Sequence, residues 1–168
     1  GEGTRDMERK DETKNKKGYK GMGVAFEGYP EISGEEIRAA LDFGCRQILH
    51  VLPGFTDKFQ HAFSTKGFYP PVENRDWTCG FWTGEIWLAY EHCGDERLRH
   101  AGEVQGHDFL NRIDNKISVD HHDMGFLYSP SCVAAYKLIG SQEGREAALK
   151  AADQLVSRFQ PIGEFIQA

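Results

Sequence analysis

Four consecutive residues, Asp120, His121, His122 and Asp123, concentrate titratable chemistry between two apolar segments of the chain. The residues that follow have a helix-like pattern, so the second aspartate is expected at a helix N-terminus. The partial positive charge of a helix start favours an ionised carboxylate, whereas burial among apolar side chains favours the protonated form. A carboxyl group under these opposed influences can act as a general base or share a proton with another acid.

A metal site and a capping loop are the alternatives for this DHHD motif. Adjacent side chains at a helix start point about 100° apart, so His121 and His122 cannot easily hold one ion together. The HExxH spacing is absent, and no further cysteine or histidine lies close in the sequence, so we predict no metal and no cofactor. The capping alternative stays open: Asp120 or Asp123 would accept backbone N–H groups, and the histidines would bond to nearby carbonyl groups.

A second candidate is an aromatic segment, in which three tryptophans and a phenylalanine lie within the eleven residues 77–87. Trp82 and Ile86 fit the buried face of a helix, which is the simplest interpretation of the pattern. Trp77 and Phe81 instead fall at the junction between a loop and that helix, where an aromatic side chain can line a pocket. Because flat aromatic faces can stack on the apolar C–H faces of sugar rings, this junction is a candidate sugar-binding site.

Two glycines, Gly80 and Gly84, lie one turn apart in the same segment. Glycine has no Cβ, so each position lets a neighbouring element or a ligand approach the helix closely. We therefore expect a close contact on this side of the helix.

The recurrence of apolar residues predicts five helices, over residues 33–52, 79–92, 94–113, 121–139 and 141–159. Pro130 is expected to bend the fourth of these helices. Residues 54–78 are rich in turn-forming residues and are predicted to form a long loop. No segment shows a sustained period of two, so the predicted fold class is all-α, built of stacked helical hairpins.

The first predicted helix begins with a capping box formed by Ser33 and Glu36. Ile37, Leu41 and Ile48 then recur at helical spacing, which predicts a helix with these residues on one apolar face.

Composition excludes some functions. The chain has 168 residues, 39% of them hydrophobic, and a net charge of −6, which argues against nonspecific binding to nucleic acid because such binding needs a basic face. No apolar run approaches the ~20 residues of a membrane span, so no membrane partner is predicted. The four cysteines are widely spaced and indicate reduced thiols in a cytoplasmic protein. Residues 1–22 are charged and poor in aliphatic side chains, which predicts a disordered lead before a folded part at 23–168.

Several segments together resemble a known family. They are WTCGFWTGEIWLAYE, GDERLR, VDHHDMGFLYSPSCVAAYKLIG, AADQL and the terminal FIQA, in that order. They are similar to the unsaturated glucuronyl hydrolases of glycoside hydrolase family 88, from about residue 34 to residue 168. The resemblance implies a cytoplasmic enzyme with an (α/α)6 toroid, of which this chain would be an N-terminal portion.

The resemblance also implies a reaction and a site. These enzymes act on unsaturated disaccharides that polysaccharide lyases release from glycosaminoglycans. They protonate C4 and add water at C5 of the unsaturated uronate, and the hemiketal that results collapses and releases the other sugar. By motif match, Asp123 is a catalytic residue, His122 contacts the substrate, and Trp77 and Phe81 are the aromatic walls. We assign His121 to structure.

One feature of the family is missing from the sequence. A second catalytic aspartate and a pocket tryptophan would fall beyond Ala168, and an incomplete toroid would expose apolar helix faces. We therefore expect the 168-residue chain alone to be inactive and prone to associate. Two alternatives remain: an unsaturated rhamnogalacturonyl hydrolase of the same fold, and a noncatalytic helical module that binds sugar or protein.

Overall fold

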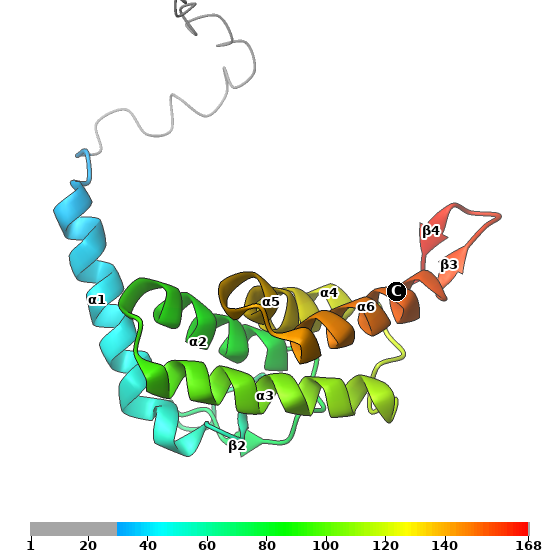
Figure 1. Ribbon diagram of the computed structural model, residues 1–168, viewed down its shortest axis with the longest axis horizontal. Coiled ribbons are helices and arrows are strands. Elements are labelled where there is room, and N and C mark those ends of the chain that lie inside the picture. Colours follow the sequence, from blue (N-terminus) through cyan, green and yellow to red (C-terminus); the bar gives the residue numbers. More distant parts are fainter. Residues whose placement is uncertain (1–29, 168) are drawn as a thin grey trace, which may run out of the picture. The chain divides into compact units, whose positions relative to one another are not determined.

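The computed structural model describes residues 30–167 (Figure 1). The chain divides into two units, Gly1–Gly34 and Glu35–Ala168, and only residues 30–34 of the first are described. The disordered lead predicted over residues 1–22 therefore lies outside the described residues. Nearly all of the secondary structure of the described residues belongs to the second unit.

Helices dominate the described residues, which confirms the predicted all-α class. The α-helices are α1 (Gly34–Val51), α2 (Cys79–Cys93), α3 (Glu96–Asp114), α4 (Met124–Tyr128), α5 (Ala134–Ile139) and α6 (Gln142–Val156). A short 3-10 helix, Leu52–Gly54, follows α1, and a π-helical turn, Ser129–Val133, joins α4 to α5. Among residues 30–167, no helix is long and apolar enough to cross a membrane.

Two glycine-containing corners connect successive helices. Gly94 ends α2 with a φ of 66°, and the Asp95 side chain caps α3 by accepting a hydrogen bond from the backbone N–H of Arg97. Gly140 ends α5 with a φ of 70°, and the Ser141 hydroxyl caps α6 in the same way. Glycine tolerates the left-handed backbone that ends a helix, and Asp and Ser are favoured at the next N-cap. These local signals produce the helical hairpins that the sequence predicted.

The fourth predicted helix is divided into two parts. α4 ends at Tyr128, and α5 begins at Ala134 after a π-helical turn that contains Pro130. Proline has no N–H to donate, and its ring crowds the preceding turn, so the regular bonding pattern cannot continue through it. The Ser131 hydroxyl donates a hydrogen bond to the carbonyl of Leu127 within this turn. The predicted helix is thus interrupted at Pro130 by a π-helical turn, and the bend expected there stays a prediction.

Short strands occur where none was predicted. β1 (Phe59–Gln60) pairs antiparallel with β2 (Pro71–Val72) inside the predicted loop. β3 (Phe159–Gln160) pairs antiparallel with β4 (Phe165–Ile166), and α6 stops at Val156, so the prediction of a helix to residue 159 was wrong. Strands of two residues are too short to produce a period-two pattern in the sequence.

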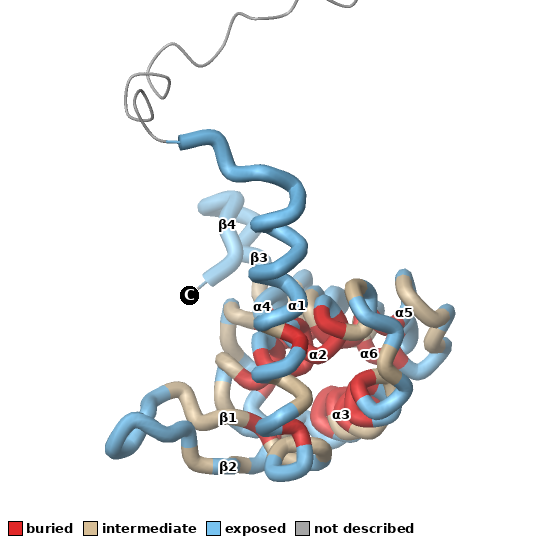
Figure 2. Tube along the Cα trace, turned by 90° about the vertical axis from the view of Figure 1, so that its left-hand side faces the viewer, coloured by how far each residue is buried: buried red, intermediate tan, exposed pale blue. Residues whose placement is uncertain are grey.

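The core surrounds α2, which packs against α3 and against the segment from α4 to α5. Trp82, Ile86 and Ala89 of α2 are buried, as are Leu98 and Phe109 of α3, in agreement with the predicted apolar faces. Figure 2 shows buried stretches in α2 and α3, and Met124, Leu127 and Cys132 of the neighbouring segment are buried as well. The position of α2 between these elements leaves little of its surface exposed.

The apolar face of α1 is largely exposed. Ile37 and Leu41 are half exposed, Ile48 is partly buried, and Cys45 is the one residue of α1 that is buried (Figure 2). The helix predicted from this spacing is present, and in the part of the chain that the structure describes its apolar face is left largely uncovered. A periodic pattern shows that a helix has an apolar face, but it does not identify the element that covers that face.

Candidate active site

The DHHD motif forms the loop between α3 and α4, and Asp123 directly precedes α4. The backbone carbonyl of Asp123 accepts a hydrogen bond from the N–H of Phe126 at 2.9 Å. Within residues 30–167, however, its carboxylate accepts no capping hydrogen bond, and the Asp120 carboxylate forms an ion pair with Arg158. The capping alternative is therefore wrong for Asp123, whose carboxylate is left available for chemistry.

His121 holds the backbone of this loop. Its Nε2 lies 2.9 Å from the carbonyl oxygen of Ser118, and its Nδ1 accepts a hydrogen bond from the backbone N–H of Asp123 at 3.2 Å. Because Nδ1 is an acceptor, the hydrogen must be on Nε2, so this arrangement uses the neutral imidazole. Ser118 has a φ of 47°, a strained value for a residue with a side chain, and the bond to His121 helps to hold it there.

His122 faces the carboxylate instead. Its Nε2 lies 3.2 Å from Oδ1 of Asp123, whereas Nδ1 of His121 is 3.7 Å from Oδ2 and already accepts from the backbone. The Asp123 side chain is 20% exposed and that of His122 is 51% exposed, so both can be reached by a small molecule. The pair can exchange a proton between carboxylate and imidazole, or direct hydrogen bonds at a ligand.

Three partly exposed aromatic rings form a cluster beside this loop. Trp77 and Phe81 have ring centroids 6.2 Å apart, and Phe126 lies 6.0 Å from Trp77 and 5.5 Å from Phe81. The three residues are 45%, 42% and 48% exposed, respectively. The structure therefore brings the two predicted wall residues together and adds Phe126. The signal that could have identified it is its place one helical turn after Asp123.

Gly80 lets α4 reach the aromatic side of α2. A Cβ built at Gly80 would lie 2.1 Å from the carbonyl oxygen of Phe126 and 2.5 Å from that of Leu127. At Gly84 a Cβ would lie 2.8 Å from Cβ of Pro130. The expected close approach is confirmed at both glycines, and the partner is the protein's own α4 segment. This contact places Phe126 beside Phe81.

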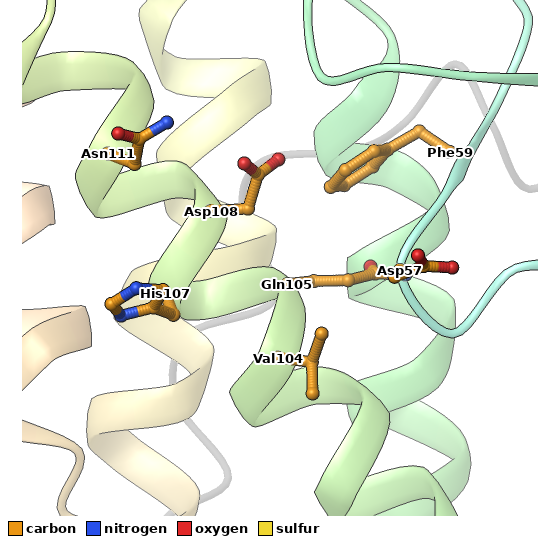
Figure 3. A pocket seen from close by; sticks show the side chains of 7 residues that line it. All are labelled: Asp57, Phe59, Val104, Gln105, His107, Asp108 and Asn111. Atoms are coloured by element: carbon orange, nitrogen blue, oxygen red, sulfur yellow. The ribbon is translucent and has the colours of Figure 1, made fainter.

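A separate pocket of 350 Å³ lies between α3 and the 57–59 segment (Figure 3). Its lining residues are Asp57, Phe59, Val104, Gln105, His107, Asp108 and Asn111. Figure 3 shows the Gln105 and Asp108 side chains pointing from α3 toward that segment. The Gln105 amide is engaged by the fold, because it donates to the carbonyl of Phe55 at 2.7 Å and accepts from the Thr83 hydroxyl at 2.6 Å. None of the predicted site residues lines this pocket.

Burial raises the pKa of the Asp108 carboxyl in this pocket. In the described part of the chain, no three His, Cys, Asp or Glu side chains are grouped so that they could hold a metal ion. The absence of a metal or cofactor stays a prediction.

Comparison with known proteins shows which proteins the chain resembles. No family model matches the chain, but it is 44% identical over 139 residues to the unsaturated chondroitin disaccharide hydrolase of Streptococcus pneumoniae. That match covers 83% of the chain and 35% of the relative. The crystal structure of an unsaturated glucuronyl hydrolase from Streptococcus agalactiae matches with a TM-score of 0.81 at 40% identity, again over 83% of this chain and 35% of that one. The chain is related to the unsaturated glucuronyl hydrolases.

A further structure from Streptococcus agalactiae, a mutant unsaturated glucuronyl hydrolase complexed with dGlcA-GalNAc6S, matches with a TM-score of 0.78 at 37% identity over 81% of this chain and 36% of that one. The chain thus spans about a third of the length of these glucuronyl hydrolases. The predicted fold class, a partial (α/α)6 toroid built of helical hairpins, is confirmed by this likeness. The roles of Asp123, His122, Trp77 and Phe81 stay predictions.

Proposed function

We propose that this chain supplies part of the active site of an unsaturated glucuronyl hydrolase. The substrate would be a lyase-generated glycosaminoglycan disaccharide, whose unsaturated uronate would be released from the neighbouring sugar in a hydrated, ring-opened keto form. One observation carries the proposal: the accessible Asp123 carboxylate lies 3.2 Å from His122, on a loop next to three partly exposed aromatic rings. The carboxylate can handle a proton, the imidazole can donate a hydrogen bond, and the rings can hold a sugar.

The proposed reaction is the hydration of the C4=C5 vinyl ether. A proton adds to C4, and the hydroxyl group of a water molecule adds to C5 and gives a hemiketal. The hemiketal collapses, the ring opens, and the neighbouring sugar departs with the proton that balances it. This sequence needs one group to deliver a proton and another to accept one from water. We assign one of these two roles to Asp123, and we propose that His122 keeps the carboxylate oriented and contacts the substrate.

Trp77 and Phe81 would enclose the unsaturated ring, with Phe126 as a third wall. The C4=C5 bond flattens that ring, and a flat ring presents more surface to an aromatic face. Each of the three side chains keeps nearly half of its surface exposed, which leaves area for a ligand to cover.

The comparisons support the substrate class. One relative is a hydrolase of unsaturated chondroitin disaccharides, and one matched structure is complexed with dGlcA-GalNAc6S. We further propose that a second acid from outside this chain is required, so that the 168-residue chain binds the disaccharide without turnover. A cytoplasmic location, expected from the cysteines, stays a prediction.

The test follows the ultraviolet absorbance of an unsaturated chondroitin disaccharide mixed with the chain, together with ligand-detected NMR for binding. The conjugated double bond absorbs, and hydration removes that absorbance. Binding with constant absorbance is the expected result. Decay of absorbance would support the hydrolase and contradict the need for a second acid, whereas absence of both binding and decay would overturn the proposal. An unsaturated rhamnogalacturonyl disaccharide in the same assay decides between the two substrate types.

A noncatalytic sugar-binding module also predicts binding without turnover. Asp123→Asn tests the catalytic role in any longer form of the protein that is active. A module that only binds sugar needs no ionisable group at this position, whereas the proposed reaction does. Loss of turnover with binding retained supports the catalytic role of Asp123.

A further inference from the structure

Arg112, in the last turn of α3, is a charged residue that is 1% exposed. A buried charge is costly unless its hydrogen-bonding groups are paired. Burial lowers the pKa of this guanidinium. The contacts of the Arg112 guanidinium show how its burial is compensated.

The guanidinium reaches two separate loops. On one side, Nη1 donates to Oδ1 of Asn74 at 2.7 Å and to the carbonyl of Asp76 at 3.0 Å. On the other side, Nε donates to the carbonyl of Ile117 at 3.1 Å, and Nη2 donates to that of Ser118 at 2.8 Å. The first loop precedes the aromatic segment, and the second precedes the DHHD motif.

In each loop, a further hydrogen bond connects a residue that Arg112 contacts to a residue of the proposed site. The Asp76 carboxylate accepts a hydrogen bond from the backbone N–H of Trp77 at 2.7 Å. The Ser118 carbonyl also lies 2.9 Å from Nε2 of His121, whose Nδ1 accepts from the N–H of Asp123. Short chains of hydrogen bonds thus run from one side chain, Arg112, to both parts of the site.

We propose that Arg112 is a positioning residue that fixes the Asp123 loop relative to the Trp77 loop, and so sets the spacing between the proton-handling group and the aromatic wall. The inference rests on the proposed function of Asp123 and Trp77. Arginine suits this task because its planar fork carries five N–H groups that point in fixed directions. Lysine keeps the charge but concentrates its donors on one atom, so it cannot serve both loops at once.

The experiment uses the full chain labelled with fluorotryptophan and observed by fluorine NMR. Of the three tryptophans, all within residues 30–167, Trp82 and Trp87 are buried and Trp77 is exposed. In Arg112→Lys we expect the Trp77 resonance to shift or broaden, while the Trp82 and Trp87 resonances stay in place. The dissociation constant for the unsaturated chondroitin disaccharide should rise roughly tenfold, as expected for the loss of hydrogen bonds from a charged group.

Arg99→Lys is the matched control. Arg99 lies on α3 as well, but it is partly exposed and pairs with Glu96 and Glu103 on the same helix. The control should leave all three resonances and the dissociation constant unchanged. A folded Arg112→Lys protein with an unchanged Trp77 resonance and unchanged binding would overturn the inference.

A second variant covers the case in which Arg112→Lys unfolds. Asn74→Ala removes one contact of the guanidinium on the Trp77 side alone, so it should shift the Trp77 resonance and leave the backbone amide of Asp123 unchanged. If both amide and resonance stay in place, the inference fails.

The two proposals fail in different ways. If the unaltered chain binds no disaccharide, the proposed function fails, and the fluorine spectrum still decides whether Arg112 positions Trp77. If the unaltered chain binds and Arg112→Lys binds equally well with an unchanged Trp77 resonance, the function survives and the positioning role does not.

Discussion

Replacement of Gly80 by alanine should damage both the fold and the site, because α4 lies directly against this glycine. The new Cβ would lie 2.1 Å from the carbonyl oxygen of Phe126, and ordinary van der Waals contact begins at 3.4 Å. The α4 backbone must therefore withdraw by about 1.3 Å, and a backbone atom cannot rotate aside as a side chain can.

The cost can be estimated from three contributions. Overpacking costs about 1–3 kcal/mol, and a clash with backbone belongs at the upper end of that range. Separation of the Phe126 and Phe81 rings, now 5.5 Å apart, loses about 0.5–1 kcal/mol more. Alanine recovers about 1 kcal/mol over glycine in a helix interior. The net expectation for Gly80→Ala is a loss of about 2–3 kcal/mol in the free energy of unfolding.

Urea denaturation measures this loss, and Gly106→Ala supplies the control. Gly106 is also buried in a helix, but apart from its chain neighbours and the backbone of its own helix, no atom of the described residues lies within 4 Å of a Cβ built there. The control should be neutral or more stable by up to about 1 kcal/mol. Disaccharide binding should weaken in Gly80→Ala only, since the Phe126 wall moves. Equal stability of the two variants would refute the packing argument.

Three further predictions concern single groups. Asp123→Asn should change the free energy of unfolding by less than about 0.5 kcal/mol. The loss of a helix cap would cost about 1 kcal/mol, but within residues 30–167 the Asp123 side chain makes no capping hydrogen bond. Urea denaturation measures the difference. Burial raises the pKa of the Cys132 thiol to about 12, above its ordinary value near 9. The folded state therefore favours the neutral thiol, and this contribution to stability is complete below pH 9 and is lost as the pH rises toward 12. The free energy of unfolding should therefore fall above pH 9, and less steeply in Cys132→Ala. Ile37→Glu with Leu41→Glu should reduce self-association in light scattering, because both side chains are half exposed; a monomeric unaltered chain would contradict the expectation.

The sequence predicted those parts of the fold that depend on neighbours in the chain. The Gly94–Asp95 and Gly140–Ser141 corners carry their own stop and start signals, and the structure places a helix end and a helix start at both. Pro130 likewise interrupts its helix through its own covalent structure.

Contacts between distant segments could not be predicted in this way. Arg112 and Asn74 are separated by 38 residues, and nothing in either local pattern indicates that they meet. The DHHD motif identified Asp123, but the exposure of its carboxylate follows from how the loop is held. The apolar stripe of α1 was visible in the sequence, whereas its exposure at Leu41 depends on which elements pack against it.

The two corners also have a consequence for the order of folding. Each joins helices that are adjacent in the chain, so both hairpins can form by closing short loops at small entropic cost. The hydrogen bonds from Arg112 to Asn74 and from Arg158 to Asp120 each span 38 residues, and they can form only after the hairpins have docked. We therefore expect the amides of the 118–123 loop to gain protection after those of the corners, which pulsed hydrogen exchange during refolding would resolve. Completion of the 118–123 loop would be the last event in folding and its release the first in unfolding, so mild stress would release this loop while the helices remain intact.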